Sequence, residues 1–362
     1  MKSLLLGATI LGLVIPVAYA QDKPVTIVSY NVQNLFDTID DANNPRDDTY
    51  LPNAEKEARG KDHDDNCESY NDKGSHYYKQ CIELNWDEET YKQKLMTLGA
   101  VIRSFPETPD ILVLPETENK QVLDDLVNKA LGGLDYNTVV QLDTSNNEEN
   151  RGIDVGIISR LPLKGEPEAI TIFGEGDPNP NDCNATRDIL KASFEMPDGE
   201  TMYVFGVHFP SGTAFECRKD AMEVLNRERE KLPEDANVVA AGSFNFTCTD
   251  IQTGEFQALT REGNWSYPPE IVGCASPGSA FYYRDQSWSF LDLIIVSNSL
   301  RPDQESDSTW FADLGSFHTV VTHPSQYAGD ARSRVRPRRF NPDNNQGASD
   351  HWPVLMRFLG RF

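Results

Sequence analysis

Beyond its first twenty residues, the sequence has no long apolar run, and no later segment approaches the roughly 18 apolar residues that a membrane-spanning helix needs. The first twenty residues are different. They carry Lys2, an apolar run over Leu4–Val17 and the small-residue site Ala18-Tyr19-Ala20, a pattern typical of a secretory signal. We expect residues 1–20 to be a signal peptide cleaved after Ala20, and the mature protein to be secreted or periplasmic without a membrane anchor.

The sequence also lacks the Cys-x-x-Cys pairs that mark many metal sites. It has an even number of cysteines, six in all, which in an exported chain favours disulfide bonds over metal binding. Parity does not determine their connectivity. The simplest arrangement joins neighbours in the sequence, which gives the pairs Cys67–Cys81, Cys183–Cys217 and Cys248–Cys274.

An excess of positive charge is absent too. The chain has 33 basic and 57 acidic residues and a formal net charge of −24, which argues against a protein that binds nucleic acid through a general cationic surface. One local exception is the segment 331–340, which holds five arginines within eight residues, from Arg332 to Arg339. This run is either solvated surface or one side of a substrate groove; in the second case replacing Arg336, Arg338 and Arg339 would weaken polymer binding.

No Pro/Gly/Ser-rich linker and no internal repeat divides the chain. We therefore expect residues 21–362 to form one domain and the protein to be a monomer. An acidic segment at about 38–85, rich in Asp, Asn and Gly, is expected to be a solvated insertion held by Cys67 and Cys81. Its carboxylates would suit calcium, but their spacing matches no EF-hand loop.

Strand-like and helix-like segments alternate along the chain, which indicates an α/β fold. Apolar runs predict strands, and apolar residues at helical spacing predict helices. The expected strands are 25–31, 110–114, 136–142, 154–159, 202–208, 238–241, 290–296 and 351–358, and the expected helices are 91–105, 121–131 and 219–231.

Polar side chains recur where these predicted strands end. They are amides, carboxylates and histidines, a set suited to metal-assisted attack on a phosphate ester, because carboxylate and amide oxygens bind hard cations and imidazoles move protons. Singly, each is more often a structural residue. The residues at or beside strand termini are Asn31, Glu116, His208, Asn245, Asp292, Asp350 and His351.

The order and surroundings of these residues resemble the endonuclease/exonuclease/phosphatase family, the relatives of deoxyribonuclease I, and especially its secreted bacterial nucleases. The resemblance covers almost the whole mature chain. It implies a four-layer α/β sandwich of two packed mixed β-sheets flanked by helices. The motifs that carry it lie at residues 29–37, 116–119, 151–155, 186–190, 207–211, 242–245, 282–292 and 349–351.

The same resemblance implies a metal site. Glu116 would bind a divalent cation, with Asn31 beside it and Asp350 nearby. Mg²⁺ is the expected ion, with Mn²⁺ and Ca²⁺ as alternatives.

It also implies catalytic roles. His351 and Asp292 would form a histidine–carboxylate pair, and His208 would contact or protonate the phosphate ester. Asn245 would orient the scissile phosphate or the water, and Arg151 would bind phosphate oxygens through its guanidinium fork.

Three positions depart from the family pattern. Ser243 stands where the family has a water-activating aspartate, Gln33 where many relatives carry an acid, and Pro115 where a glutamine is usual. A serine hydroxyl cannot serve as a base near neutral pH. If Ser243 faces the attacking water, Ser243→Asp should raise hydrolysis by about 100-fold or more.

These observations predict an exported metal-dependent phosphodiesterase, a nuclease that hydrolyses extracellular DNA or RNA by in-line water attack. A phosphatase or a phospholipid phosphodiesterase of the same fold is the alternative within the family. A catalytically impaired binding module is the alternative outside enzymes, because Ser243 and Gln33 replace acids.

Overall fold

Two six-stranded mixed sheets form the centre of the protein. The computed structural model describes residues 23–41, 44, 46–144, 151–173, 181, 183, 186–212, 214–268, 277–329 and 335–361. Sheet A has the strand order β13-β16-β1-β2-β4-β3, and sheet B has the order β5-β6-β7-β8-β12-β9. The strands of sheet A are β1 (Val25–Ser29), β2 (Ile111–Thr117), β3 (Thr138–Val140), β4 (Asp154–Ser159), β13 (Trp310–Thr319) and β16 (Val354–Gly360). Those of sheet B are β5 (Glu168–Ile170), β6 (Ile189–Glu195), β7 (Thr201–His208), β8 (Asn237–Ser243), β9 (Trp265–Ser266) and β12 (Asp292–Ser297).

The central strands are apolar on both faces because both faces are covered. On β2, Ile111 and Val113 belong to the core between the two sheets. Leu112 and Leu114 belong to a second core on the other side of sheet A. Since successive side chains of a strand point to opposite faces, a continuous apolar run serves two cores, as expected for strands buried on both sides.

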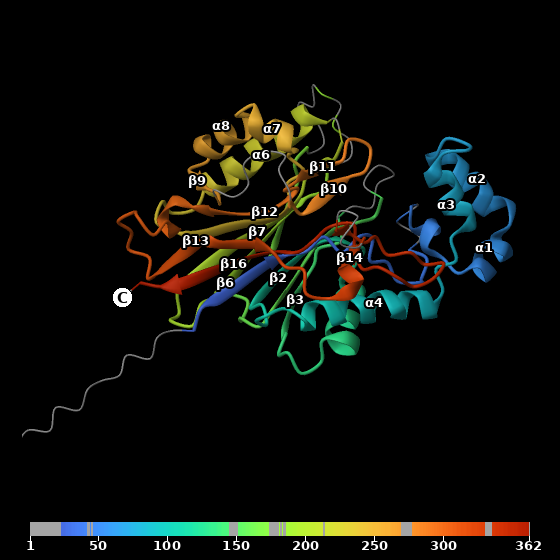
Figure 1. The fold of residues 1–362 in the computed structure, drawn as a ribbon, viewed down its shortest axis with the longest axis horizontal. Helices are drawn as coiled ribbons and strands as arrows, with labels where there is room; N and C mark the ends of the chain where they lie inside the picture. The colour runs from blue at the N-terminus through green and yellow to red at the C-terminus, as the bar shows by residue number, and fades with distance from the viewer. Residues whose placement is uncertain are drawn as a thin grey trace, which may run out of the picture.

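Helices cover the two outer faces. Below sheet A lie α4 (Glu88–Arg103) and α5 (Lys120–Asp125), which continues into the π-helix η2 (Leu126–Ala130). Above sheet B lie α6 (Phe215–Glu230), α7 (Cys248–Gln252) and α8 (Glu255–Glu262). Figure 1 shows this arrangement of helices, two sheets and helices. The predicted four-layer α/β sandwich is confirmed.

The predicted elements agree with the structure in kind and differ at their ends. The helix predicted over 219–231 starts earlier, at Phe215. The last strand, predicted from His351, starts only at Val354, after Pro353, which has no N–H to donate to a neighbouring strand. The remaining described elements are short: η4 (Asn298–Leu300), η5 (Pro324–Gln326), the pair β10 (Ala280–Tyr282) and β11 (Ser287–Ser289), and the pair β14 (Tyr327–Ala328) and β15 (Arg336–Pro337).

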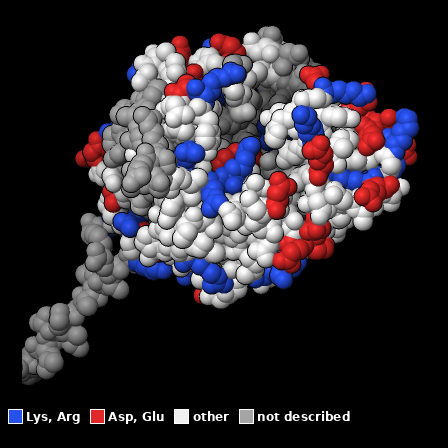
Figure 2. Space-filling model, turned by 45° about the vertical axis from the view of Figure 1, so that its right-hand side comes forward, with Lys and Arg blue, Asp and Glu red and all other residues white. Residues whose placement is uncertain are grey.

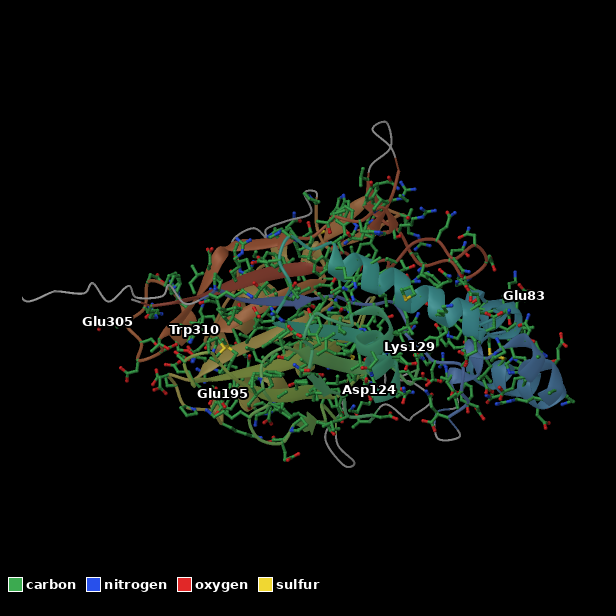
Figure 3. The ribbon with its side chains drawn as sticks, turned by 90° about the horizontal axis from the view of Figure 1, so that it is seen from below. Glu83, Asp124, Lys129, Glu195, Glu305 and Trp310 are labelled. Carbon is green, nitrogen blue, oxygen red and sulfur yellow. A yellow bond between two sulfur atoms is a disulfide. The ribbon has the colours of Figure 1, made fainter. Side chains whose placement is uncertain are left out.

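The segment expected to be a solvated insertion is a small helical unit. It contains η1 (Asp47–Tyr50), α1 (Asn53–Arg59), α2 (Lys61–Tyr70) and α3 (His76–Glu83), and it stands beside the sandwich (Figure 1). Figure 3 shows Glu83 at this end of the molecule and Trp310 at the opposite end.

The insertion has a polar interior of its own. The Lys56 ammonium, which is only 5 % exposed, donates hydrogen bonds to the carbonyls of Thr49, Cys81 and Leu84. A buried ammonium with three acceptors is satisfied, so it ties α1 to α3. The expectation of a wholly solvated segment is therefore wrong, although most of its acidic residues face water.

Two predicted disulfides are present. Cys67–Cys81 joins α2 to α3, and Cys183–Cys217 joins a loop to α6. Cys248 is also disulfide-bonded, while its predicted partner Cys274 lies outside the described residues. The predicted signal peptide, residues 1–20, lies outside them as well. Within the described ranges, no helix is long and apolar enough to cross a membrane.

Candidate active site

The polar residues predicted from the strand ends meet at one edge of the sandwich. β1 and β2 are parallel, as are β7 and β8, so their carboxyl ends share that edge. β12 runs antiparallel to β8 and begins there. In this register His208 lies opposite Ser243, and Ser243 lies opposite Asp292. Three neighbouring strands of sheet B, β7, β8 and β12, thus place three polar side chains next to one another.

Gly242 makes this close approach possible. Its φ is 144°, and a Cβ placed on it would lie 2.0 Å from the carbonyl oxygen of Val207. Only glycine fits such a contact without moving the backbone. The glycine that ends the apolar run of β8 therefore lets β8 pass close to β7 and places Ser243 at the edge.

Glu116 lies at the centre of the site. It is the extra residue of a β-bulge, because Pro115 and Thr117 pair with consecutive residues of β4, and its φ is +68°. Bulges of this kind re-aim a side chain. The Asn31 amide and the Asn34 backbone N–H each donate a hydrogen bond to one carboxylate oxygen of Glu116, at 3.2 and 3.0 Å.

Cationic and imidazole groups surround this carboxylate. Arg151 and His208 each lie 3.8 Å from Oε1 of Glu116. Burial opposes ionisation of Glu116, but Arg151, His351, the hydrogen bond from Asn31 and Arg187 outweigh it and lower the pKa of Glu116. The result is an ionised carboxylate that is only 14% exposed. An anion held in this way is a suitable ligand for a hard divalent cation.

The other two predicted metal ligands are differently placed. Asn31 lies beside Glu116, but its amide nitrogen faces Glu116, while its oxygen accepts the backbone N–H of Gln33 at 2.9 Å. In this arrangement Asn31 orients the carboxylate. Asp350 accepts a hydrogen bond of 2.6 Å from Arg339, so this ion pair competes with any cation for the Asp350 carboxylate.

The predicted histidine–carboxylate pair is formed. Nδ1 of His351 lies 2.6 Å from Oδ2 of Asp292. The other Asp292 oxygen accepts a 2.7 Å hydrogen bond from the Ser243 hydroxyl. The same hydroxyl accepts a 3.2 Å hydrogen bond from Asn31. A continuous hydrogen-bonded chain thus runs from Glu116 through Asn31, Ser243 and Asp292 to His351.

This hydrogen-bond network corrects one prediction made from the sequence. Ser243 does not face an attacking water: it has no exposed surface, and its hydroxyl is engaged with Asp292 and Asn31. Its role in this geometry is to position two neighbours.

The two histidines of the site differ in charge. Burial lowers the pKa of His208 well below its usual value, and Arg187, Arg151 and His351 lower it further. His351 is also buried, but the charge and hydrogen bond of Asp292 outweigh burial and raise the pKa of His351 to about 9. Near neutral pH the site therefore holds a neutral His208 and a protonated His351.

Asn245 follows β8 with a φ of +58°. Its amide nitrogen donates a 2.6 Å hydrogen bond to the carbonyl of Phe209, the residue after His208. Asn245 is 4 % exposed. The amide oxygen is thus the part of Asn245 left for a water or a substrate hydroxyl.

Sequence reasoning gave no role to two residues that shape the site. Arg187 is buried beside Glu116, and burial lowers the pKa of its guanidinium to about 9. The sequence feature that could have revealed Arg187 is the motif at residues 186–190.

Gln33 accepts a hydrogen bond from the backbone N–H of Phe340 at 2.9 Å and donates one to the Phe340 carbonyl at 3.5 Å. The amide of Gln33 therefore fixes the segment after the arginine run.

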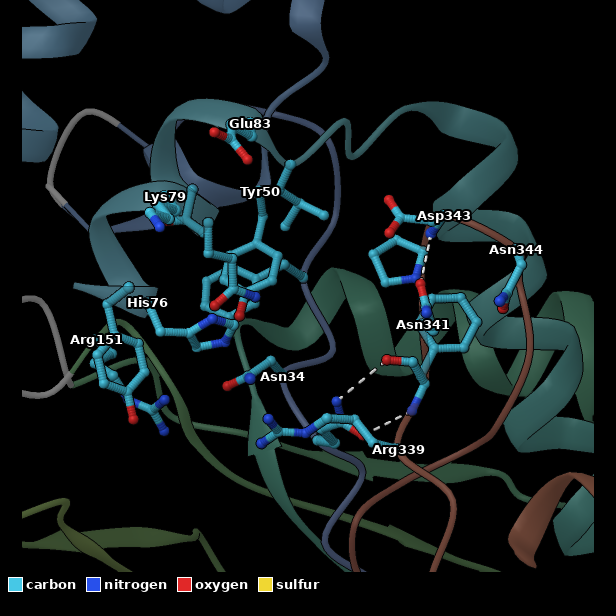
Figure 4. A pocket seen from close by; sticks show the side chains of 18 of the residues that line it. Asn34, Tyr50, His76, Lys79, Glu83, Arg151, Arg339, Asn341, Asp343 and Asn344 are labelled. Atoms are coloured by element: carbon cyan, nitrogen blue, oxygen red, sulfur yellow. Dashed lines mark hydrogen bonds between the residues drawn. The ribbon is translucent and has the colours of Figure 1, made fainter. Parts of the chain in front are cut away.

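A cavity of about 710 Å³ adjoins this site. Asn34, Arg151 and Arg339 line it, and each contacts an acid of the site. Figure 4 shows His76 and Asn34 directed toward the same space, with Arg151 to one side and Arg339 to the other. Figure 2 shows a hollow on one face with Lys and Arg side chains gathered beside it, on a chain whose formal charge is −24.

Comparisons with known proteins identify the family and the fold of this chain. The sequence profile of the Endonuclease/Exonuclease/phosphatase family matches residues 64–359. A search of curated proteins found no match.

Among solved structures, an endonuclease/exonuclease/phosphatase family protein from Bacteroides thetaiotaomicron is 14% identical, with a TM-score of 0.53, 94% of this chain covered and 99% of that one. TDP2 from D. rerio, solved with a single-strand DNA product, is 16% identical, with a TM-score of 0.50 and coverage of 93% and 99%. A variant of beta toxin from Staphylococcus aureus, solved with bound magnesium ions, is 14% identical, with a TM-score of 0.50 and coverage of 94% and 100%. These similarities show a shared fold.

Proposed function

The chain belongs to the endonuclease/exonuclease/phosphatase family, and from this premise we propose that it is an exported phosphodiesterase that uses a divalent cation to hydrolyse nucleic acid. As a member of the family it is a phosphoester hydrolase. The cation, the export and the substrate are the proposal. Two disulfides among the described residues support export, because such bonds persist in oxidising compartments.

The observation that carries the proposal is the Glu116 carboxylate, 3.8 Å from the His208 imidazole, with the Asp292–His351 pair at the same edge. Glu116 would hold the cation, with Asp350 joining it once Arg339 is displaced. A cation there would neutralise charge on the phosphoryl oxygens and lower the pKa of a bound water.

The protein groups then divide the remaining work. Arg151, one third exposed, offers its guanidinium fork to a phosphate oxygen, and neutral His208 donates a hydrogen bond to another. Protonated His351 holds a proton that it can give to the departing oxygen, and Asp292 stabilises that protonated form. The Asn245 oxygen orients the attacking water.

Assays of the purified mature protein on a panel of phosphoesters test this proposal. The panel contains single-stranded and duplex DNA, RNA, sphingomyelin vesicles and inositol phosphates, each with Mg²⁺, Mn²⁺ or Ca²⁺ and each with EDTA. We expect hydrolysis of a nucleic acid that EDTA abolishes. If the protein hydrolyses the lipid or the inositol phosphates but none of the nucleic acids, the site belongs to the alternative phosphoester substrates.

A binding module is the second candidate, and the full engagement of Ser243 favours it. Because Ser243 faces Asp292 and Asn31 and not water, position 243 supplies no base to the site. Complete inactivity on every substrate and cation, together with retained nucleic-acid binding, would favour this reading over the enzyme.

A further inference from the structure

The helical insertion forms a wall of the cavity beside the active site. Five residues of the cavity come from α3, namely His76, Tyr77, Lys79, Gln80 and Glu83. Other lining residues come from the segment 338–346, and Tyr283 comes from the turn between β10 and β11. The cavity is therefore built from segments that are distant in the sequence, and Asn34 and Arg151, which contact Glu116, also line it.

Two exposed aromatic rings line this cavity. Tyr77 and Tyr283 are each 60 % exposed, unusual for large rings that a protein normally buries. They lie on separate elements, so each ring can offer a face to one bound group. Arg336 lies over the Tyr283 ring, with its guanidinium carbon 4.9 Å from the ring centre, which holds that ring beside a positive charge.

The charge of the cavity lining is opposite to that of the chain. Among the described residues, acidic side chains at the cavity are Glu83 and Asp343. The basic side chains that line it are Arg46, Lys79, Arg151, Arg338 and Arg339. Aromatic faces combined with basic side chains are the usual elements of surfaces that bind unpaired nucleotides.

The walls of the cavity are held in place. Cys67–Cys81 ties α3 to α2, and Lys56 bonds the carbonyls of Cys81 and Leu84. On the other side, Gln33 bonds both backbone groups of Phe340. A fixed site loses less entropy when it binds a ligand.

We propose that this cavity binds an unpaired nucleotide next to the scissile phosphate, with Tyr77 and Tyr283 stacking on bases and the basic side chains contacting the backbone. A volume of about 710 Å³ is that of a pocket for a small organic ligand, which suits one or two nucleotides. A base in a duplex has both faces covered by its neighbours, whereas an unpaired base can stack on side chains. The inference rests on the proposed function and narrows it to single-stranded nucleic acid.

Binding measurements without cleavage test the pocket separately from catalysis. The probe is a short fluorescein-labelled oligodeoxyadenylate, and its binding is followed by anisotropy in EDTA, alone and as a duplex. We expect the parent to prefer the single strand. Tyr77→Ala and Tyr283→Ala should each weaken its binding by about 5- to 100-fold, whereas Tyr77→Phe and Tyr283→Phe should retain most of it.

Two controls make the result specific. Met96→Ala removes an exposed apolar side chain from α4, which contributes no residue to the cavity, and should change nothing. The phenylalanine variants are the second control, because they keep both aromatic faces and lose only the hydroxyl groups.

Equal affinity of the parent for single strand and duplex, or unchanged binding by both alanine variants, would overturn the inference. Loss of sphingomyelin hydrolysis in the tyrosine variants, with no effect on the oligonucleotide, would overturn it as well. If the parent hydrolyses no phosphodiester but the tyrosine variants lose oligonucleotide binding, the pocket stands and the proposed enzyme fails.

Discussion

The His351 ring and the Asp292 carboxylate form a 2.6 Å contact at the edge of the sandwich, and Asp292 has no exposed surface. This pair raises the pKa of His351 to about 9 against the effect of burial. If catalysis needs protonated His351, kcat/KM should hold up to about pH 9 and fall above it. Asp292→Asn should move this alkaline limb toward the ordinary histidine value of about 6.5.

The same pair predicts a change in stability. Because the pKa of His351 is raised in the folded state, its stabilising contribution is fully present below about pH 6.5 and is lost as the pH rises through about 9. Urea unfolding of the parent and Asp292→Asn across this range checks it. A stability difference that stays constant with pH would contradict the assigned pair.

Glu116→Gln should remove cation binding while the fold persists. The amide keeps an acceptor for Asn31 or Asn34 but loses the charge that attracts a cation. We expect activity to fall by about 100-fold or more, the scale on which one lost electrostatic contact affects catalysis. Titration calorimetry with Mn²⁺ measures the binding. Glu195→Gln, an exposed change on β6, is the control, and parent-like Mn²⁺ binding by Glu116→Gln would refute the site.

Arg339→Ala should tighten cation binding. It removes the partner that now occupies Asp350, and because the pair is partly exposed, we expect only a few-fold decrease in the Mn²⁺ Kd at low salt. Arg338→Ala is the matched control, since Arg338 bonds Gln346 instead. An unchanged Kd in both variants would mean that Asp350 is not a ligand.

The disulfide between Cys67 and Cys81 should stabilise the protein mainly by restricting the conformations of the unfolded chain. The two cysteines are 14 residues apart, and a loop of about this length contributes roughly 3 kcal/mol in the chain-entropy model. Replacing both with serine should lower the free energy of unfolding by that order and weaken oligonucleotide binding, because α3 loses its tie to α2. An unchanged denaturation midpoint would show that the hydrogen bonds of Lys56 hold α3 in place without the disulfide.

The sequence predicted the site well where strand ends determine it. His208, Ser243 and Asp292 follow or begin apolar strands, so strand direction brings them to one edge once β7, β8 and β12 are neighbours in one sheet. Glu116 could be placed near that edge, but the bulge that aims it depends on pairing with β4, which no local pattern encodes.

Other features needed tertiary contacts. The pairing of Arg339 with Asp350 joins residues whose side chains could equally face solvent. The buried interior of the insertion depends on Lys56 reaching three carbonyls of other segments, and composition alone made that segment look solvated. The orientation of the Asn31 amide, with its nitrogen and not its oxygen toward Glu116, likewise depends on neighbouring residues.

Ser243 gives the sharpest test, because the sequence and the structure predict opposite results for Ser243→Asp. From the sequence, a carboxylate here should activate water and raise the rate about 100-fold. In the structure, the hydroxyl is buried 2.7 Å from Oδ1 of Asp292. A carboxylate in its place would lie against a second carboxylate, and like charges in contact raise the pKa of one of them.

We therefore expect Ser243→Asp to lower kcat, because the added carboxylate repels that of Asp292, which weakens the contact between Asp292 and His351, and because it disturbs Asn31. Ser243→Asn is the matched neutral variant. Its amide can donate to Asp292 and accept from Asn31, as the hydroxyl does, so it should keep more activity than the aspartate. Steady-state kinetics of parent and both variants on one substrate decide the matter. A gain of about 100-fold in kcat for Ser243→Asp would show that position 243 reaches the attacking water after all, and that the natural chain lacks a base there.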